Sequence, residues 1–429
     1  MDNQSSGIRV NSIDALRAIS IFGMIFSAAI GYGSGLPQWM FHCQVPPPSY
    51  VFTPEIRGIT WVDLVFPFFL FSMGAVFPFS IGRRLRSAQG KLSVSLGIIR
   101  RGVILMAFAV AVGNLNVVPG AGNWGAVYSF VMWLCLFAAL LRTSHQWVNY
   151  AGWGVVVLMT VLQGSFLGTP FKFGNFDVIL ELLAVASVLG GLIYQYTSEN
   201  LRLRALFVLL VAALKMLGFD FTQYLVIVLS ASIIGDVIRT KTQGGLCGGK
   251  SGLPALLALA AVPVMLWSFF TRNVLIGFGI SFALAVAFAL LTLRSRSAFS
   301  IVGWIGFGML LAGTGFDPID GGIAKDYCNL SYLFSTCGMA ALTLCFLMWV
   351  ESRGALSRNL VYAGQNPMVA YTIPWTVVSP LLYAVGLLGW LDGICIGSPV
   401  LGLCRGLVVT LPMMALTCLL SWKKIYLRS

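Results

Sequence analysis

Long apolar runs recur along the chain from Ile13 to the C-terminus, and only short polar breaks separate them. A hydrocarbon core about 30 Å thick needs roughly 20 consecutive apolar residues per helix. The pattern therefore predicts an all-α polytopic bundle of about twelve to fourteen transmembrane helices, in which the short segments within 204–238 either pair as half-helices or form one broken span. The expected spans cover residues 13–33, 59–81, 95–114, 123–141, 147–165, 176–196, 204–219, 222–238, 253–270, 274–293, 299–316, 330–350, 359–378 and 399–421.

The composition agrees with this pattern. Hydrophobic residues make up 58% of the chain and charged residues only 10%, and the mean hydropathy is +0.88. Soluble domains carry about 25% charged residues, so a soluble protein is excluded. We therefore predict a single integral membrane domain over residues 1–429, surrounded by the lipid bilayer.

The net charge of +13 is unevenly distributed between the expected loops. Loops on one side hold most of the lysines and arginines, whereas the opposite loops hold only Arg57, Lys172, Arg272 and Lys325. Because positive residues accumulate on the cytoplasmic side, we expect both termini in the cytoplasm and the loop 34–58 outside. This topology accounts for the charge, so nucleic acid is not predicted as a partner.

One of the two histidines, His42, lies in that outward loop, before the proline run 46–48. Asp63 lies near the outer end of the next span, where its carboxylate can reach an imidazole in the loop. A carboxylate bound to one ring nitrogen raises the basicity of the other, as a general base or nucleophilic histidine requires. The alternatives are that Asp63 caps its helix and that His42 is an ordinary loop residue.

Few charged residues fall inside or beside the expected spans, and each is a functional candidate because a charge is costly in the bilayer. Asp14 and Arg17 share a helix face near the inner end of the first span, where they form a buried ion pair or present Arg17 to an anionic ligand. Arg100 and Arg101 are expected to reach the membrane interface, with phosphate binding as the alternative. Asn366 either lines a cavity or satisfies the backbone of a broken helix.

The outward segment GFDPIDGGIAKDYCNLSYLF lacks the regular acidic spacing of a calcium loop. We expect Asp320 and Lys325 to hydrogen-bond a polar external ligand instead. The nine cysteines show no CxxC pairing, so no metal site is predicted. Cys43, Cys328 and Cys395 lie in or near outward loops, where they form a disulfide or remain single packed thiols.

Three segments, SIDALRAISIFGM, GYGSG and GITWVDLVFPFFLFSMG, together resemble the heparan-alpha-glucosaminide N-acetyltransferase family and its bacterial relatives, some of them described as N-acetylglucosamine-related transporters. The family opens with Ser-Leu-Asp…Arg-Gly, where this chain has Ile13 for the Leu and Ala18 for the Gly. The second motif is matched by Gly58, Thr60 and residues 63–67. The resemblance is specific over about residues 1–115 and 299–375.

The position of the family's catalytic histidine depends on how the residues are counted. In the lysosomal enzyme it lies ten residues before the Asp, which is Thr53 here, whereas the spacing from the Gly-rich turn leads to His42. An insertion of about CQVPPPSYVFTPE between the histidine and the helix reconciles the two. Gly31 replaces the Asn that begins the turn, so one polar contact of the family has no counterpart here.

The resemblance implies a transmembrane acetyltransferase that moves an acetyl group from cytoplasmic acetyl-CoA to a glucosamine-like amino sugar or related glycan outside, in a bacterial inner membrane. An amino-sugar transporter remains the alternative. The implied partners are a small-molecule acyl donor and a sugar acceptor, without metal, and a homodimer is left open. The implied residues are catalytic His42 and Asp63, acetyl-CoA-binding Asp14, Arg17, Arg100, Arg101 and Asn366, and acceptor-binding Asp320 and Lys325.

Overall fold

In the computed structural model the chain is all-α, as the apolar pattern predicts. The structure describes residues 10–87, 90–115, 122–143, 145–167, 171–220, 223–241, 246–247 and 251–427. Within these ranges there is no β-sheet, and the bridge found pairs Leu141 with Leu427. Residues 1–9 and 428–429 lie outside them. The cytoplasmic placement of both termini stays a prediction.

Each expected span contains at least one helix. The α-helices are α1 (Asn11–Ala29), α2 (Val65–Arg86), α3 (Lys91–Leu115), α4 (Gly122–Leu140), α5 (Gln146–Leu167), α6 (Val178–Thr197), α7 (Leu201–Met216), α8 (Leu225–Lys241), α9 (Gly252–Thr271), α10 (Val274–Thr292), α11 (Ala298–Phe316), α12 (Leu330–Ser352), α13 (Arg358–Gln365), α14 (Pro367–Ile373), α15 (Ser379–Ala384), α16 (Leu387–Ile394) and α17 (Pro399–Trp422). Two short 3₁₀ helices, η1 (Gln38–Met40) and η2 (Trp61–Leu64), precede α2, and the π-helix η4 (Pro374–Val378) joins α14 to α15.

Nine helices in the described part of the chain are long and apolar enough to cross a membrane, namely α1, α2 with η2, α3, α6, α9, α10, α11, α12 and α17. A tenth crossing arises if the bent segment from α14 to α16 counts as one span. Helices α7 and α8 have 16 and 17 residues, which is about 24–26 Å of helix and less than the hydrocarbon thickness. The polytopic helical bundle is confirmed, and α4, α5, α7 and α8 account for the larger number of spans expected.

The main departure from the expected spans lies between residues 358 and 394. In place of one helix over 359–378, the chain forms α13, breaks at Asn366, and continues through α14, η4 and α15 to α16. Pro367 begins α14 and has no N–H to donate, which interrupts the helical hydrogen bonds at this point. The segment then bends by 85° between α15 and α16, at Gly386, whose φ of 77° is in the left-handed region.

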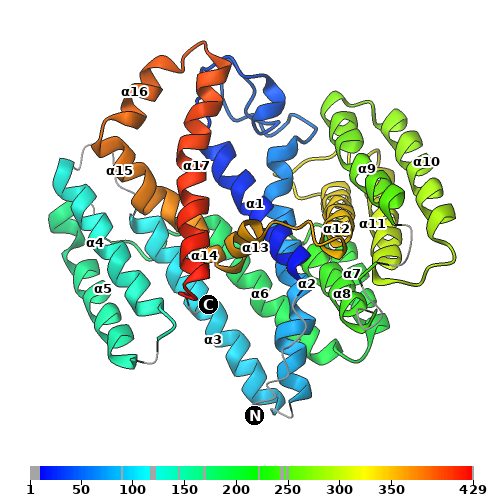
Figure 1. The fold of residues 1–429 in the computed structure, drawn as a ribbon, viewed down its shortest axis with the longest axis horizontal. Helices are drawn as coiled ribbons and strands as arrows, with labels where there is room; N and C mark the ends of the chain where they lie inside the picture. Colours follow the sequence, from blue (N-terminus) through cyan, green and yellow to red (C-terminus); the bar gives the residue numbers. More distant parts are fainter. Residues whose placement is uncertain are drawn as a thin grey trace.

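Helices α1 and α2 lie at the centre of the bundle, and paired helices flank them (Figure 1). On one side α4 packs on α5, and on the other side α9 packs on α10 and α11 packs on α12. Helix α8 runs along α2, while α13 and α17 pack against α1. The two central helices therefore connect most of the bundle, and they carry several of the candidate functional residues.

Helices α2 and α8 approach so closely that no side chain fits at two glycines. A Cβ atom on Gly74 would lie 2.2 Å from the carbonyl oxygen of Val228, and one on Gly235 would lie 2.3 Å from that of Ala75. Small residues allow such backbone contact between membrane helices, whose association depends on van der Waals packing. The two glycines thus fix the distance between α2 and α8.

We expect Gly235→Val to lower the free energy of unfolding by about 2 kcal/mol or more, because the two helices must separate to admit the side chain. Denaturation of the purified protein in a mixed-detergent titration measures this change. Gly308→Val on α11 is the matched control, since nothing lies within 4 Å of a Cβ atom at Gly308. Equal losses of stability in the two variants would contradict the close contact of α2 with α8.

Candidate functional site

His42 lies in the long loop between α1 and α2, and hydrogen bonds close this loop on itself. The side-chain amide of Gln44 donates to the carbonyl oxygens of Ile56 and Gly58, at 3.1 and 3.2 Å. The backbone amide of Gly58 donates in turn to the carbonyl oxygen of Ile323, at 2.9 Å, in the loop between α11 and α12. The backbone around His42 is therefore tied to a second loop, although it lies outside any helix.

Asp63 is buried in η2, at the start of α2, and its two carboxylate oxygens have different partners. Oδ2 accepts hydrogen bonds from the backbone amide of Thr60 at 2.9 Å and from its hydroxyl at 3.3 Å, in a capping box that begins the helix. Oδ1 lies 2.6 Å from Nδ1 of His42. The sequence left a helix cap and a histidine partner as alternatives, and one carboxylate makes both sets of contacts.

Lys325 joins this pair from the loop between α11 and α12. Its Nζ lies 3.1 Å from Nδ1 of His42 and 3.6 Å from Oδ1 of Asp63. The contact with His42 joins residues that are 283 positions apart in the sequence. The charge pattern places these two loops on the same side of the membrane, and in the structure they meet at one end of the bundle. The outward orientation of this end stays a prediction.

Hydrogen bonds on both sides hold the loop that carries Lys325. Asp317 accepts from the backbone amide of Ile323 at 2.7 Å and pairs with Arg272 through two bonds of 3.0 and 2.8 Å. The side chain of Asn329 accepts from the backbone amide of the residue before Lys325, at 3.2 Å. The ammonium group of Lys325 is therefore carried by a fixed backbone.

The geometry gives the two ring nitrogens of His42 different roles. Nδ1 donates to the carboxylate of Asp63, because an ionised carboxylate only accepts, and this bond assigns the tautomer. Nε2 then holds a lone pair and is the nitrogen that can take up a proton. The His42 side chain is 37% exposed while that of Asp63 is 0% exposed. An accessible imidazole backed by a buried carboxylate can act as a general base or as a nucleophile.

Tyr332 supports this site from α12 and was not predicted. Its hydroxyl donates to the backbone carbonyl oxygen of Asp63 at 2.8 Å, and its side chain is fully buried. A buried tyrosine hydroxyl needs a hydrogen-bond partner. The sequence shows that need, because Tyr332 lies at the start of an apolar span, but it does not identify the partner.

Asp320, which was expected to bind an external ligand beside Lys325, contacts the start of α12 through one carboxylate oxygen. Its Oδ2 accepts a hydrogen bond from the backbone amide of Ser331 at 2.7 Å, in the first turn of α12. Burial raises the pKa of the Asp320 carboxyl above its usual value. The structure therefore brings Lys325 to His42 and leaves Asp320 at a helix end.

Cys43, next to His42, does not compete as a nucleophile. Burial raises the pKa of its thiol to about 12, so the thiol stays protonated near neutral pH. All nine cysteines of the chain are free. Of the two alternatives for the outward cysteines, the structure therefore shows single packed thiols.

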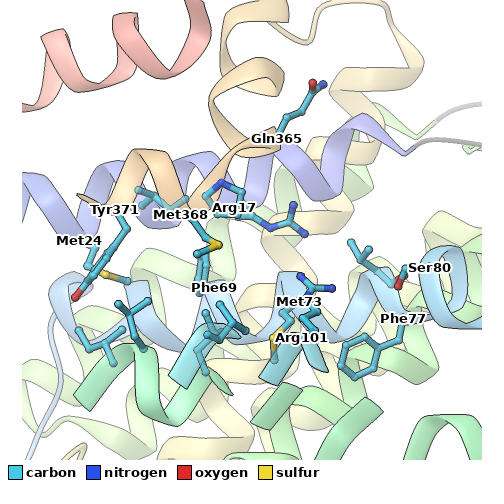
Figure 2. A pocket seen from close by; sticks show the side chains of 17 residues that line it. Arg17, Met24, Phe69, Met73, Phe77, Ser80, Arg101, Gln365, Met368 and Tyr371 are labelled. Carbon is cyan, nitrogen blue, oxygen red and sulfur yellow. The ribbon is translucent and has the colours of Figure 1, made fainter. Parts of the chain in front are cut away.

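A cavity lies further along α2, among α1, α3, α6, α13 and α14. Figure 2 shows Met24 and Tyr371 at one end of this cavity and Phe77 and Ser80 at the other. Most of the lining side chains are apolar, and two arginines are the charged residues among them. The cavity is thus an elongated apolar space with positive charge on its wall.

Arg17 reaches this cavity from α1 and is held by three helices. Its Nη1 donates to Oδ1 of Asp14 and to the carbonyl oxygen of Gly364, both at 3.1 Å. Its Nε and Nη2 donate to the hydroxyl and the carbonyl oxygen of Ser72, both at 3.3 Å. Arg17 therefore forms the ion pair that its spacing from Asp14 allows and also places a fixed positive charge beside the cavity.

Arg101 enters the same cavity from α3, whereas Arg100 does not. Figure 2 shows the Arg101 side chain directed toward that of Arg17, and the two guanidinium groups repel each other. In the part of the chain that the structure describes, no carboxylate pairs with Arg101. Arg100 lies beside Trp153 in a separate groove. Of these two neighbours, only Arg101 is placed to meet a ligand in the cavity.

Asn366, another candidate for donor binding, lies outside the wall of the cavity. Its side-chain amide donates to the backbone carbonyl oxygen of Ile425 at 2.8 Å. The neighbouring Gln365 lines the cavity instead. Asn366 thus ties the break between α13 and α14 to the chain after α17, and a role in donor binding stays a prediction.

Residues 9–232, just over half of the chain, match the family model described as "Domain of unknown function (DUF5009)". Heparan-alpha-glucosaminide N-acetyltransferase of Mus musculus is 29% identical over 124 residues, which cover 29% of this chain and 17% of that protein. The protein of the same name from Homo sapiens is 28% identical over 184 residues, which cover 38% of this chain and 26% of that protein. The chain spans about a quarter or less of these relatives, and the matches confirm the distant relationship that the motifs indicate.

Proposed function

The chain belongs to the family described as a domain of unknown function, DUF5009, and we propose that it is a transmembrane acetyltransferase that uses acetyl-CoA to acetylate an amino sugar or related glycan. The observation that carries the proposal is the 2.6 Å contact between the accessible imidazole of His42 and the buried carboxylate of Asp63. The names of the two relatives supply the reaction class.

The cavity suits an acyl-CoA donor in charge and in polarity. Arg17 is paired with Asp14, whereas no carboxylate in the described residues pairs with Arg101, so the wall keeps a net positive charge that phosphate groups can neutralise. Met24, Phe69 and Met73 provide apolar surface for the uncharged arm that carries the thioester. An anionic ligand with a long, less polar arm fits this distribution better than a small polar sugar does.

The cavity and the His42 site lie along the same helix. Between Asp63 and Ser80, η2 and α2 rise by about 25 Å, which approaches the thickness of the hydrocarbon core. A donor extended along α2 can therefore direct its thioester toward His42 while its phosphates stay near the other end. This arrangement supports a reaction between a donor from one side of the membrane and an acceptor from the other.

In the proposed reaction the acceptor amine or hydroxyl attacks the thioester carbonyl carbon, the carbon–sulfur bond breaks, and an amide or ester forms. Nε2 of His42 takes the proton that the acceptor loses and passes it to the departing sulfur. Asp63 fixes the orientation of the ring and stabilises its positive charge. In a second route, Nε2 attacks the thioester and carries the acetyl group before the acceptor arrives.

We place the acetyl-CoA end of this path in the cytoplasm and His42 on the outer side of a bacterial inner membrane. The charge pattern of the loops supports this orientation, since the side of the His42 loop is poor in lysine and arginine. Cysteine-accessibility labelling at position 42 with a membrane-impermeant reagent tests it. Labelling from the cytoplasmic side alone would contradict the proposed orientation.

One observation favours a second candidate, an amino-sugar transporter. The chain between residues 358 and 394 consists of short helices with a break and a bend, and discontinuous helices often form substrate sites in transporters. A transporter would need neither acetyl-CoA nor a basic imidazole. Uptake of labelled N-acetylglucosamine into vesicles without acetyl-CoA, unchanged in His42→Ala, would favour it.

We expect Arg101→Gln to weaken acetyl-CoA binding about tenfold or more, because the change removes a charge-assisted contact with a phosphate group. Isothermal titration calorimetry of the purified protein measures the dissociation constant. Arg100→Gln is the matched control, since the same change is made one residue away and outside the cavity. If the parent protein bound no acetyl-CoA at millimolar concentration, the transporter would become the better candidate.

A further inference from the structure

Nδ1 of His42 has two close neighbours of opposite charge. Oδ1 of Asp63 lies at 2.6 Å and Nζ of Lys325 at 3.1 Å. Only one of them can hydrogen-bond to this nitrogen, because a protonated Nδ1 donates to a carboxylate, whereas an ammonium group donates only to an unprotonated nitrogen. With Asp63 as the partner, Lys325 is a positive charge beside the ring and not a donor to it.

From this juxtaposition we propose that Lys325 is a positioning residue that keeps His42 unprotonated, and therefore able to take up a proton, when the acceptor arrives. The inference rests on the proposed acetyl transfer for its meaning in catalysis, and on electrostatics alone for its effect on His42. Lys325 acts through the imidazole and needs no contact with either substrate. This role differs from the acceptor binding that the sequence suggested for Lys325.

In the described part of the chain, Lys325 is the cation within hydrogen-bonding distance of the ring. Asp63 favours a protonated imidazole and Lys325 opposes it, while Cys43 stays uncharged because burial raises the pKa of its thiol to about 12. The other titratable groups of the surrounding loops, α9 and α12 have partners of their own or are solvated. Arg272 pairs with Asp317, Arg57 lies over the ring of Tyr327, Tyr332 donates to a backbone carbonyl, and Glu55 and Asp326 are exposed.

The proposed reaction needs an unprotonated His42 at two points, before it takes up the acceptor's proton and after it releases that proton. The ring must be uncharged to take the acceptor's proton, and the resulting cation must then give that proton to the departing sulfur. A carboxylate alone at 2.6 Å favours retention of the proton on the ring. The ammonium of Lys325 opposes that retention, so it favours the unprotonated ring before the transfer and the release of the proton after it, while Asp63 stabilises the charged ring in between.

The position of this ammonium is fixed by the backbone that carries it. The Lys325 loop is joined to the His42 loop through Gly58 and Ile323, and Nζ of Lys215 donates to the carbonyl oxygen of Tyr327 at 2.7 Å on the other side of Lys325. The Lys325 side chain is 29% exposed, so solvent screens part of its field.

Because the chain has two histidines, the protonation of His42 can be followed directly. In a His145→Gln background, diethyl pyrocarbonate modifies His42 as the one remaining histidine, and it reacts with the uncharged ring. Mass spectrometry of the His42 peptide measures the modification rate at each pH, and the midpoint is the pH at which this rate is half of its maximum. We expect Lys325→Met to raise that midpoint by about one pH unit, since the protonated ring is no longer opposed, Lys325→Arg to keep it, and Asp63→Asn to lower it.

An unchanged or lower midpoint in Lys325→Met would overturn the role of Lys325. Size-exclusion chromatography checks the fold of each variant, and Lys325→Gln replaces Lys325→Met if the latter aggregates. Acetyl transfer is measured separately, and the acid limb of kcat/KM should move to higher pH in Lys325→Met by the same amount. If the parent protein transfers acetyl groups but Lys325→Met does not shift the midpoint, only the role of Lys325 is overturned. If Lys325→Met shifts the midpoint but the parent protein transfers no acetyl group, the proposed function is overturned and the electrostatic role of Lys325 stands.

Discussion

Replacing His42 with alanine is expected to lower the rate of acetyl transfer about 100-fold or more, because the proposed reaction loses the group that takes the acceptor's proton. Acetyl-CoA binding should change little, since the cavity with its arginines lies further along α2. The stability of the bundle should also change little, because the imidazole projects from a loop and is 37% exposed. Initial rates with acetyl-CoA and a glucosamine acceptor, together with calorimetric binding, measure these quantities.

Three further variants make this test specific. His145→Ala removes the other histidine, which is exposed, and should leave the rate unchanged. Asp63→Asn should impair the same step less severely than His42→Ala, because the base remains and only its orientation and charge stabilisation suffer. Thr53→Ala tests the competing register of the histidine motif. If Thr53→Ala abolished transfer while His42→Ala was silent, the assignment of His42 would be wrong.

Asp236→Ala is expected to lower the free energy of unfolding by about 3–5 kcal/mol, because it leaves a buried guanidinium without its counter-charge. Nη1 of Arg204 lies 2.7 Å from Oδ2 of Asp236, and the Arg204 side chain is 0% exposed. Its Nη2 donates to the carbonyl oxygen of Thr197 at 2.9 Å, and its guanidinium lies over the ring of Tyr194. The same mixed-detergent titration that tests the glycine contact measures this loss.

The double variant Arg204→Met with Asp236→Leu separates the ion pair from the position itself. Replacing Arg204 and Asp236 by apolar groups should recover most of the stability, since the cost comes from one unpaired buried charge. Arg239, the second cation on Asp236, is 30% exposed and is left to solvent. Arg202→Met on the same helix is the control for loss of a cation, because Arg202 is exposed. If Asp236→Ala cost no more than Arg202→Met, the buried pair would not hold α7 to α8.

The helices could be predicted from the sequence because their apolar runs match the thickness of a bilayer, but the path between them could not. Residues 367–394 stay apolar through the bend at Gly386, so the apolar run does not reveal that change of axis direction. The break, by contrast, is marked in the sequence by Gln365, Asn366 and Pro367. Arg204 begins the expected span 204–219, and the sequence does not identify a partner for it. It is fully buried because Asp236 on α8 supplies the counter-charge, and that pairing exists only once α7 and α8 pack together.

The pairing of His42 with Asp63 could be predicted because the loop leads directly into the helix that carries the carboxylate. The approach of Lys325 could not, because it depends on how the α11–α12 loop is joined to the His42 loop through Gly58. Arg100 and Arg101 are adjacent on a helix that is apolar around most of its surface, and they differ by about 100° in direction. Which of them faces the cavity is decided by the neighbouring helices and not by α3 itself.

Because one oxygen of Asp63 caps a helix and the other holds the imidazole, natural selection has two independent reasons to retain this residue. His42 has one reason, which is the proposed chemistry at Nε2. If the proposed function holds, a descendant that abandoned acetyl transfer would be expected to lose His42 early and to keep Asp63 together with its capping partner Thr60. Among relatives with different activities, the aspartate would then mark common ancestry of the fold, and the histidine would mark those members that still carry out the reaction.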